Sequence, residues 1–185
     1  MAIWTIDTAH SEIGFKIKHL VISTVSGKFT SFEGQLEGDP QDLKNAKISF
    51  SAEVESINTC NEQRDGHLKS ADFFDAANYP KLTFVSTSIV NKDGAEYKVT
   101  GDLTIRGVTK PITLTVEFGG TQVNFYGQTV AGFEITGKIN RHDFGLTWSA
   151  VTEAGGIVVS DEVKLAIAAE LVKRSEEHTS ELQSR

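Results

Sequence analysis

The residues of this sequence that could do chemistry begin with Arg64, Asp65 and His67, which lie close together in a polar segment. On a helix, Arg64 and His67 are three residues apart and share one face, with Asp65 beside them. Such a cluster could fix the head group of a ligand, gate entry to a cavity, or supply acid–base groups to an apolar substrate. The same residues could instead form a salt-bridge network that ties the helix to neighbouring strands, and the pattern favours this structural alternative.

Asp7, His10 and Ser11 have the residue types of a hydrolytic triad. Triad side chains converge from separate segments, and a serine that directly follows its histidine has poor geometry for this chemistry. We therefore interpret these residues as polar caps of the turn between the first two strands. We expect no catalytic residue among them.

Metal and nucleotide sites find no support in the sequence. No two histidines have the i, i+4 spacing of a helical zinc site, and no cysteine pair accompanies them. No glycine-rich phosphate-binding loop is present. Cys60 is the only cysteine, so no internal disulfide can form, and we expect this residue to be a small packing side chain. We expect neither a metal nor a cofactor, and we interpret the histidines as solvated or hydrogen-bonded at His10, His19, His67, His142 and His178.

Four large apolar residues, Phe73, Phe74, Phe144 and Trp148, lie outside the predicted strands. They could plug one end of a barrel as ordinary core, or they could line an apolar pocket. The sequence gives no volume, so both alternatives stay open at this point.

The composition limits the possible partners. The chain has 185 residues, with 18 Lys and Arg against 25 Asp and Glu, which gives a net charge of −7. This acidic balance argues against binding nucleic acid through its phosphates and against docking on anionic membrane surfaces. No apolar stretch approaches the ~20 residues of a membrane helix, and no basic region precedes an apolar run at the N-terminus. We therefore expect no stable membrane insertion, no secretory signal and a cytoplasmic location.

Alternation of apolar and polar residues, with a period of two, runs through most of the chain and predicts an all-β fold. About eight antiparallel strands follow from this pattern, joined by turns at 91–94, 107 and 119–120. Long runs with interior glycine, at 25–37 and 123–139, suit the bending of a barrel, with a β-sandwich as the alternative. Each strand has one apolar face, and we expect no buried charge on these inward faces.

Two segments depart from the strand pattern. A polar helical run at 61–70 belongs to a short helical insert (about 61–75) that we expect to lie over one end of the barrel. The segment 174–185 is polar, lacks periodicity and resembles a translated sequencing adapter. We expect it to be a non-native disordered tail, which leaves residues 1–173 as a single domain.

Several motifs are spread over residues 3 to about 172. They are Trp4-x-Ile6-Asp7-x-x-His10-Ser11, His19-Leu20, Val25-x-Gly27-x-Phe29-x-x-Phe32-x-Gly34, Arg64-Asp65-x-His67-Leu68, Asp72-Phe73-Phe74-Asp75, Tyr79-Pro80, Gly101-x-Leu103-Thr104-Ile105-x-Gly107-Val108-Thr109-Lys110-Pro111, Arg141-x-Asp143-Phe144-Gly145-Leu146-x-Trp148 and Ser160-Asp161-Glu162-Val163. Together these motifs resemble those of the YceI family of lipocalin-like proteins.

The resemblance implies an extended eight-stranded antiparallel lipocalin-like barrel with an apolar lumen. It also implies a polyisoprenoid chain, an isoprenoid quinone or a related amphiphile in that lumen, and no general enzyme activity. We therefore expect a carrier or sequestering protein for an apolar lipid, present as a monomer or a homodimer. Two alternatives are an enzyme that uses Arg64, Asp65 and His67 on an apolar substrate, and a filled barrel that acts through surface contacts. Many members of the family are periplasmic.

The expected ligand site combines the inward faces of the strands with the helical insert. Arg64, Asp65 and His67 would form a polar mouth that sets the preference for a head group. The side chains expected to contact the apolar chain are Phe15, Ile17, Phe29, Ile48, Phe50, Leu68, Phe73, Phe74, Phe84, Leu103, Ile105, Leu114, Phe133, Phe144 and Trp148.

Overall fold

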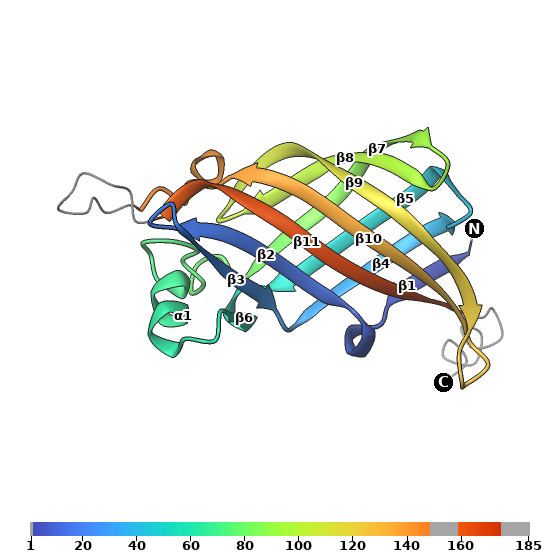
Figure 1. Ribbon diagram of the computed structural model, residues 1–185, viewed down its shortest axis with the longest axis horizontal. Helices are drawn as coiled ribbons and strands as arrows, with labels where there is room; N and C mark the ends of the chain where they lie inside the picture. Colours follow the sequence, from blue (N-terminus) through green and yellow to red (C-terminus); the bar gives the residue numbers. More distant parts are fainter. Residues whose placement is uncertain (1, 149–158, 175–185) are drawn as a thin grey trace.

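The computed structural model describes residues 2–148 and 159–174, and these form an elongated β-barrel with one short α-helix at one end (Figure 1). The only α-helix among these residues is α1 (Glu62–Lys69), and the 3₁₀ turns are η1 (Thr8–His10), η2 (Val54–Ser56) and η3 (Arg141–Phe144). The strands are β1 (Ile3–Ile6), β2 (Glu12–His19), β3 (Ser23–Phe29), β4 (Phe32–Asp39), β5 (Asp42–Glu53), β6 (Ile57–Asn58), β7 (Lys81–Asp93), β8 (Glu96–Ile105), β9 (Val108–Val123), β10 (Thr129–Asn140) and β11 (Val159–Lys173).

The barrel closes because β1 pairs with β4 on one side and with β11 on the other. The closed ring runs β1, β4, β5, β7, β8, β9, β10, β11 and back to β1, and every pairing is antiparallel. Short breaks divide three of the eight strands of the ring into two parts each. Strand β2 continues β1, β3 continues into β4, and β6 continues β5. The predicted eight-stranded antiparallel barrel is confirmed, and the β-sandwich alternative is wrong.

The chain turns at Gly94 and Gly107 as predicted, although residues 91–93 of the predicted 91–94 turn belong to β7. Gly94 and Gly107 adopt positive φ angles of 52° and 73° in the turns that follow β7 and β8. Gly107 is required for a second reason, because a Cβ atom there would lie 2.7 Å from the ring of Tyr79. Pro111 lies inside β9 and pairs with Asp102.

The predicted turn at Gly119 and Gly120 is wrong. Strand β9 continues through both residues to Val123, and the turn lies at 124–128. Gly132 pairs with Gly120 while Phe133 pairs with Phe118, so Gly119 is an additional residue that forms a β-bulge. The two glycines bend the strand where it curves around the barrel and do not end it.

The two ends of the barrel are packed differently. Away from α1, large side chains are buried and close the barrel: Trp4, Leu36, Leu43, Tyr97, Val99, Val116 and Val130. Near α1, apolar side chains such as Ile17, Val25 and Leu68 are only half-buried. The barrel is therefore closed at one end and open near the helix. Cys60, expected to be a packing residue, is exposed beside α1, which is a correction to the sequence interpretation.

The helical insert is shorter than predicted. Helix α1 begins after Asn61, whose side chain accepts a hydrogen bond from the Arg64 backbone N–H at 2.9 Å and caps the helix. The segment that follows α1 is a series of turns. Of the helices in the described part of the chain, none has the length and apolar character needed to cross a bilayer.

Of the predicted tail at 174–185, residues 175–185 lie outside the described residues. Arg174 is described, and its backbone N–H donates to the carbonyl of Ile3 at 2.8 Å, which continues the pairing of β11 with β1.

Candidate functional site

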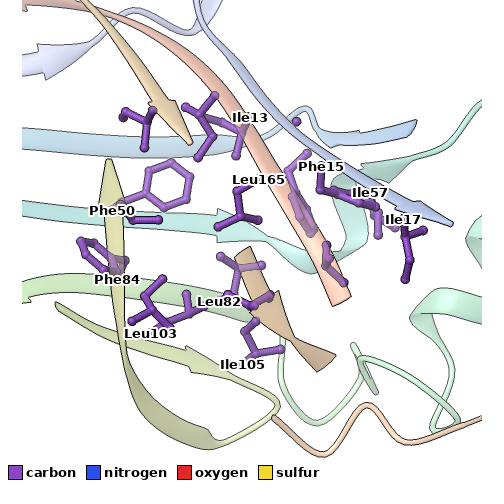
Figure 2. A pocket seen from close by; sticks show the side chains of 18 of the residues that line it. Ile13, Phe15, Ile17, Phe50, Ile57, Leu82, Phe84, Leu103, Ile105 and Leu165 are labelled. Atoms are coloured by element: carbon purple, nitrogen blue, oxygen red, sulfur yellow. The ribbon is translucent and has the colours of Figure 1, made fainter. Parts of the chain in front are cut away.

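The interior of the barrel contains a cavity of about 720 Å³, which we call the lumen. Figure 2 shows apolar side chains from β2, β5, β7, β8 and β11 that point toward one another across this space. The alternation of the strands explains the arrangement, because every second residue of each strand faces inward. The residues labelled there are Ile13, Phe15, Ile17, Phe50, Ile57, Leu82, Phe84, Leu103, Ile105 and Leu165.

The structure places almost all of the predicted contact residues on the lumen wall. Phe144 is the exception: its side chain is 1% exposed and packs into the core without lining the lumen. The predicted residues on the wall are Phe15, Ile17, Phe29, Ile48, Phe50, Leu68, Phe73, Phe74, Phe84, Leu103, Ile105, Leu114, Phe133 and Trp148.

Two glycines that face inward help to keep the lumen open. A Cβ atom on Gly27 would collide with the ring of Phe15, and one on Gly101 would collide with the ring of Phe84. Each aromatic ring therefore lies across a glycine, in the space that a side chain would otherwise occupy. The sequence shows these glycines as breaks in the apolar pattern but does not show which ring covers each one, because the pairing of strands is not readable from one strand alone.

A cluster of aromatic rings connects the segment after α1 with the lumen. The rings of Phe73 and Trp148 have centroids 5.4 Å apart, and the His67 ring lies 4.8 Å from Trp148 in an edge-to-face arrangement. Phe74 packs edge-to-face against Phe29 at 6.1 Å. Phe73, Phe74 and Trp148 thus line the lumen near its open end, whereas Phe144 is core.

The predicted polar mouth is organised around Thr59, a buried residue that the sequence reasoning did not select. The Thr59 hydroxyl donates to Oδ1 of Asp65 at 2.5 Å, and its backbone N–H donates to the same oxygen at 2.9 Å. Arg64 donates from Nε to the Thr59 hydroxyl at 2.8 Å and from Nη2 to the Thr59 carbonyl at 2.7 Å. These bonds tie the first turn of α1 to the segment after β6.

The three residues of the predicted mouth do not converge on one point. Arg64 and His67 line the lumen, but Asp65 does not. His67 Nε2 lies 2.9 Å from Oδ2 of Asp72. Asp72 follows α1 in the sequence, whereas Thr59 precedes it. Arg64 and Asp65 are tied to Thr59 by hydrogen bonds, where the structural alternative expected a salt-bridge network, and the His67 ring packs against Phe73 and Trp148.

Arg141 is a buried charge that the sequence interpretation excluded, so the expectation of uncharged inward faces is wrong. Its side chain is 2% exposed and lines the lumen near the open end. The guanidinium donates to the carbonyls of Leu146 at 2.6 Å, Trp148 at 2.7 Å and Ser160 at 2.9 Å. Burial lowers the pKa of Arg141 from its usual value, and the nearby Asp161 carboxylate opposes this shift.

The bonds of Arg141 hold two segments together at the end of the barrel. Residues 146–148 follow η3, whereas Ser160 belongs to β11, and the guanidinium lies between them. A signal for this residue was present in the sequence. Arg141 follows Ile139 by two positions, so it continues the inward set of β10 at the point where the strand becomes a helical turn.

Asp7, His10 and Ser11 lie away from the lumen and cap a turn, as the sequence predicts. Asp7 caps η1 by accepting from the Ala9 backbone N–H at 2.9 Å, and its other carboxylate oxygen lies 2.8 Å from His10 Nδ1. This hydrogen bond lowers the pKa of Asp7 and raises the pKa of His10. Glu170 also lies 3.4 Å from the His10 ring, and its backbone N–H donates to the Ser11 hydroxyl.

Comparisons with known proteins agree with the fold and with the motifs. The family model of the YceI-like domain, which describes the sequences of the family, matches residues 4–171. A UPF0312 protein of Staphylococcus aureus (strain MSSA476) is 43% identical over 171 residues, which cover 92% of this chain and 97% of that protein.

Solved structures show the same architecture. The Campylobacter jejuni YCEI protein is 38% identical, with a TM-score of 0.74, and the match covers 91% of this chain and 96% of that one. Burkholderia cenocepacia BcnA is 25% identical, with a TM-score of 0.78, over 89% of this chain and 98% of that one. A polyisoprenoid binding domain from Saccharophagus degradans has a TM-score of 0.64 at 15% identity over 92% of this chain and 98% of that one, which compares the folds alone.

Proposed function

The chain belongs to the YceI-like family, and we propose that it binds an apolar lipid in its lumen as a carrier or a sequestering protein. The observation that carries this proposal is the lumen itself, an open cavity of about 720 Å³ with an almost entirely apolar wall. Pockets that bind small molecules have volumes of about 300–1,000 Å³, so this volume favours a ligand site over a filled barrel that acts through its surface.

The size of the lumen supports a polyisoprenoid or an isoprenoid quinone as the ligand. At about 30 Å³ per water-sized group, 720 Å³ holds roughly two dozen such groups. Because an isoprene unit has five carbon atoms, this number matches a chain of about four or five isoprene units. With about 0.3 kcal/mol per non-hydrogen atom, such a chain would bind with roughly 7 kcal/mol, which corresponds to a Kd of about 10 μM.

The distribution of polar groups supports entry from the end near α1. The lumen wall carries polar side chains at this end, from Asn61, Gln63, Arg64 and His67, while apolar side chains close the opposite end. An apolar chain would therefore enter first, and its polar head group would remain near His67. The Arg141 guanidinium is directed to protein carbonyls, so it contributes to the wall more than to the recognition of a head group.

The geometry favours binding over acid–base catalysis by Arg64, Asp65 and His67. Asp65 does not line the lumen, and its carboxylate oxygen accepts two hydrogen bonds from Thr59. Arg64 is directed to Thr59 as well. A general acid or base must reach the reacting group within hydrogen-bond distance. The polar atoms of Arg64 and Asp65 are bonded to Thr59 instead.

A variant that fills about half of the lumen tests the proposal. Ile135 and Ile167 are cross-strand partners on β10 and β11, and both line the lumen. Changing both to tryptophan adds about a dozen heavy atoms, roughly half of the available room. We expect the affinity for a fluorescent polyprenyl probe to fall at least about tenfold.

The matched control is Val85→Trp, which places the same side chain on the outer face of β7, where Val85 is 55% exposed. We expect this variant to bind the probe as the unchanged protein does. Equal probe binding by the control and by a folded Ile135→Trp, Ile167→Trp variant would contradict binding in the lumen.

A further inference from the structure

The hairpin between β2 and β3 presents an apolar tip to solvent at the open end of the barrel. Leu20, Val21 and Ile22 are 38%, 72% and 84% exposed. Leu20 and Val21 also adopt positive φ angles of 53° and 64°. Glycine, asparagine and aspartate are the residues that favour this left-handed conformation, and a β-branched residue there is strained. An exposed turn built from three apolar residues therefore has no explanation in the stability of the barrel.

The outer face of the barrel beside this tip carries a row of lysines. In the strand register, Lys138 of β10 pairs with Lys164 of β11, and Lys164 pairs with Lys16 of β2. All three side chains are exposed, because their neighbours Ile139, Val163 and Ile17 face the lumen. Like charges placed directly opposite each other destabilise a sheet, so this lysine row is also unexplained by folding.

The positive charge of the row is only partly neutralised within the protein. Among the described residues, its one ion pair joins Lys138 to Glu162 at 3.6 Å. Lys28 extends the same outer face on β3. The net charge of −7 for the whole chain, which argued against anionic membranes, therefore conceals a local basic surface.

The tip, the lysine row and the mouth of the lumen adjoin one another. Figure 1 shows the hairpin of β2 and β3 at the same end of the barrel as α1. Ile17, His19 and Val25, which belong to this hairpin, line the lumen. A surface that covered the tip would therefore lie directly beside the opening.

We propose that this end of the barrel docks on an anionic lipid bilayer. Leu20, Val21 and Ile22 enter the head-group region, and the lysine row faces the anionic head groups. Apolar residues that insert beside basic side chains are the combination that holds peripheral proteins at such interfaces. The docking surface stands on its own observations, whereas its use for loading a lipid into the lumen rests on the proposed function.

The other apolar tip of the barrel provides a matched control. Phe125 and Tyr126, in the turn between β9 and β10, are 99% and 84% exposed. The flanking segment 122–128 contains no lysine or arginine, and it lies at the end opposite α1 (Figure 1). If exposed apolar residues alone sufficed, this tip would bind membranes as well as the first.

The test is sedimentation of the full chain with vesicles made of equal parts phosphatidylglycerol and phosphatidylcholine, and with pure phosphatidylcholine vesicles. We expect binding to the anionic vesicles that weakens with added salt. Lys16→Gln with Lys164→Gln should weaken it about 25-fold, at about fivefold for each lysine. Val21→Asn with Ile22→Ser should weaken it at least about tenfold, and asparagine suits the left-handed backbone, so folding is retained.

The control Phe125→Ser, Tyr126→Ser should bind the anionic vesicles as the unchanged chain does. Absence of binding by the unchanged chain would overturn the docking proposal, and so would an equal loss in this control. The proposal would also be overturned if the chain bound both kinds of vesicle and the lysine substitutions left this binding unchanged. Binding of the polyprenyl probe, measured separately without vesicles, should be unchanged in the docking variants. Absence of probe binding by the unchanged chain, with vesicle binding intact, would instead refute the lumen as a ligand site and leave the docking proposal standing.

Discussion

Replacing Arg141 with methionine should cost the barrel a large part of its stability at the open end. The change removes the donors of the three shortest hydrogen bonds from this side chain to carbonyl groups, those of Leu146, Trp148 and Ser160, at distances of 2.6, 2.7 and 2.9 Å. Each buried carbonyl left without a partner costs about 1–3 kcal/mol. Water can reach part of this end, and the buried charge disappears with the change, so we expect the lower bound of about 3 kcal/mol.

In a domain of this size, 1 kcal/mol corresponds to about 2–4 °C in Tm, so Arg141→Met should lower Tm by about 6–12 °C. Circular dichroism at increasing temperature measures this directly. Arg141→Lys should give an intermediate Tm, because one ammonium group cannot span carbonyls on both segments. The control Lys92→Met alters an exposed side chain and should stay within about 0.5 kcal/mol. A Tm for Arg141→Met within about 2 °C of the unchanged protein would refute the structural role of the guanidinium.

Two further predictions concern the lumen and the turn at η1. Phe74→Ala should weaken the binding of an apolar probe about tenfold in a fluorescence titration, because it removes a ring from the lumen wall, whereas Arg64→Ala should weaken it less, because its bonds go to Thr59; the opposite order would identify Arg64 as the binding determinant. The stability of the fold should also depend on pH. Because the pKa of His10 is raised, its contribution to stability is present below its ordinary pKa of 6.5 and is lost as pH rises through its pKa in the folded protein. The lowered pKa of Asp7 means that its contribution is present above 3.8 and lost as pH falls through the folded value. The difference in Tm between the unchanged protein and Asp7→Asn should therefore be largest between these limits, and a difference that is the same at every pH would contradict the pairing of Asp7 with His10.

The sequence predicts the barrel well because its main signal is local. Alternation places Ile17, Phe50 and Leu103 on inward faces without any knowledge of which strands pair. The turn at Gly94 is equally local, since glycine readily adopts the positive φ angle found there.

The errors arise where a residue acts through a partner that the alternation of the strands does not identify. Gly119 and Gly120 have the composition of a turn, but their pairing with β10 makes them a bulge within β9. Thr59 is an ordinary residue in the sequence, and its importance comes from the hydrogen bonds that Arg64 and Asp65 make to it. Arg141 continues the inward alternation, but only the fold shows the carbonyl groups that make its burial possible.

The lumen also could not be predicted as open or filled. Its volume depends on how the rings of Phe15 and Phe84 lie across Gly27 and Gly101, which is a result of strand register. The proposed lipid therefore rests on the cavity and on the family, not on the residue types alone.

The most direct test of the central claim is mass spectrometry of the lipid that copurifies with the protein. The full chain is purified without detergent, extracted with organic solvent and compared with the Ile135→Trp, Ile167→Trp variant, in which the added side-chain atoms occupy roughly half of the lumen. We expect a polyisoprenoid or isoprenoid quinone in the extract of the unchanged protein and its loss in the variant. An extract without lipid, from a protein that also binds no apolar probe, would contradict a lipid-binding lumen.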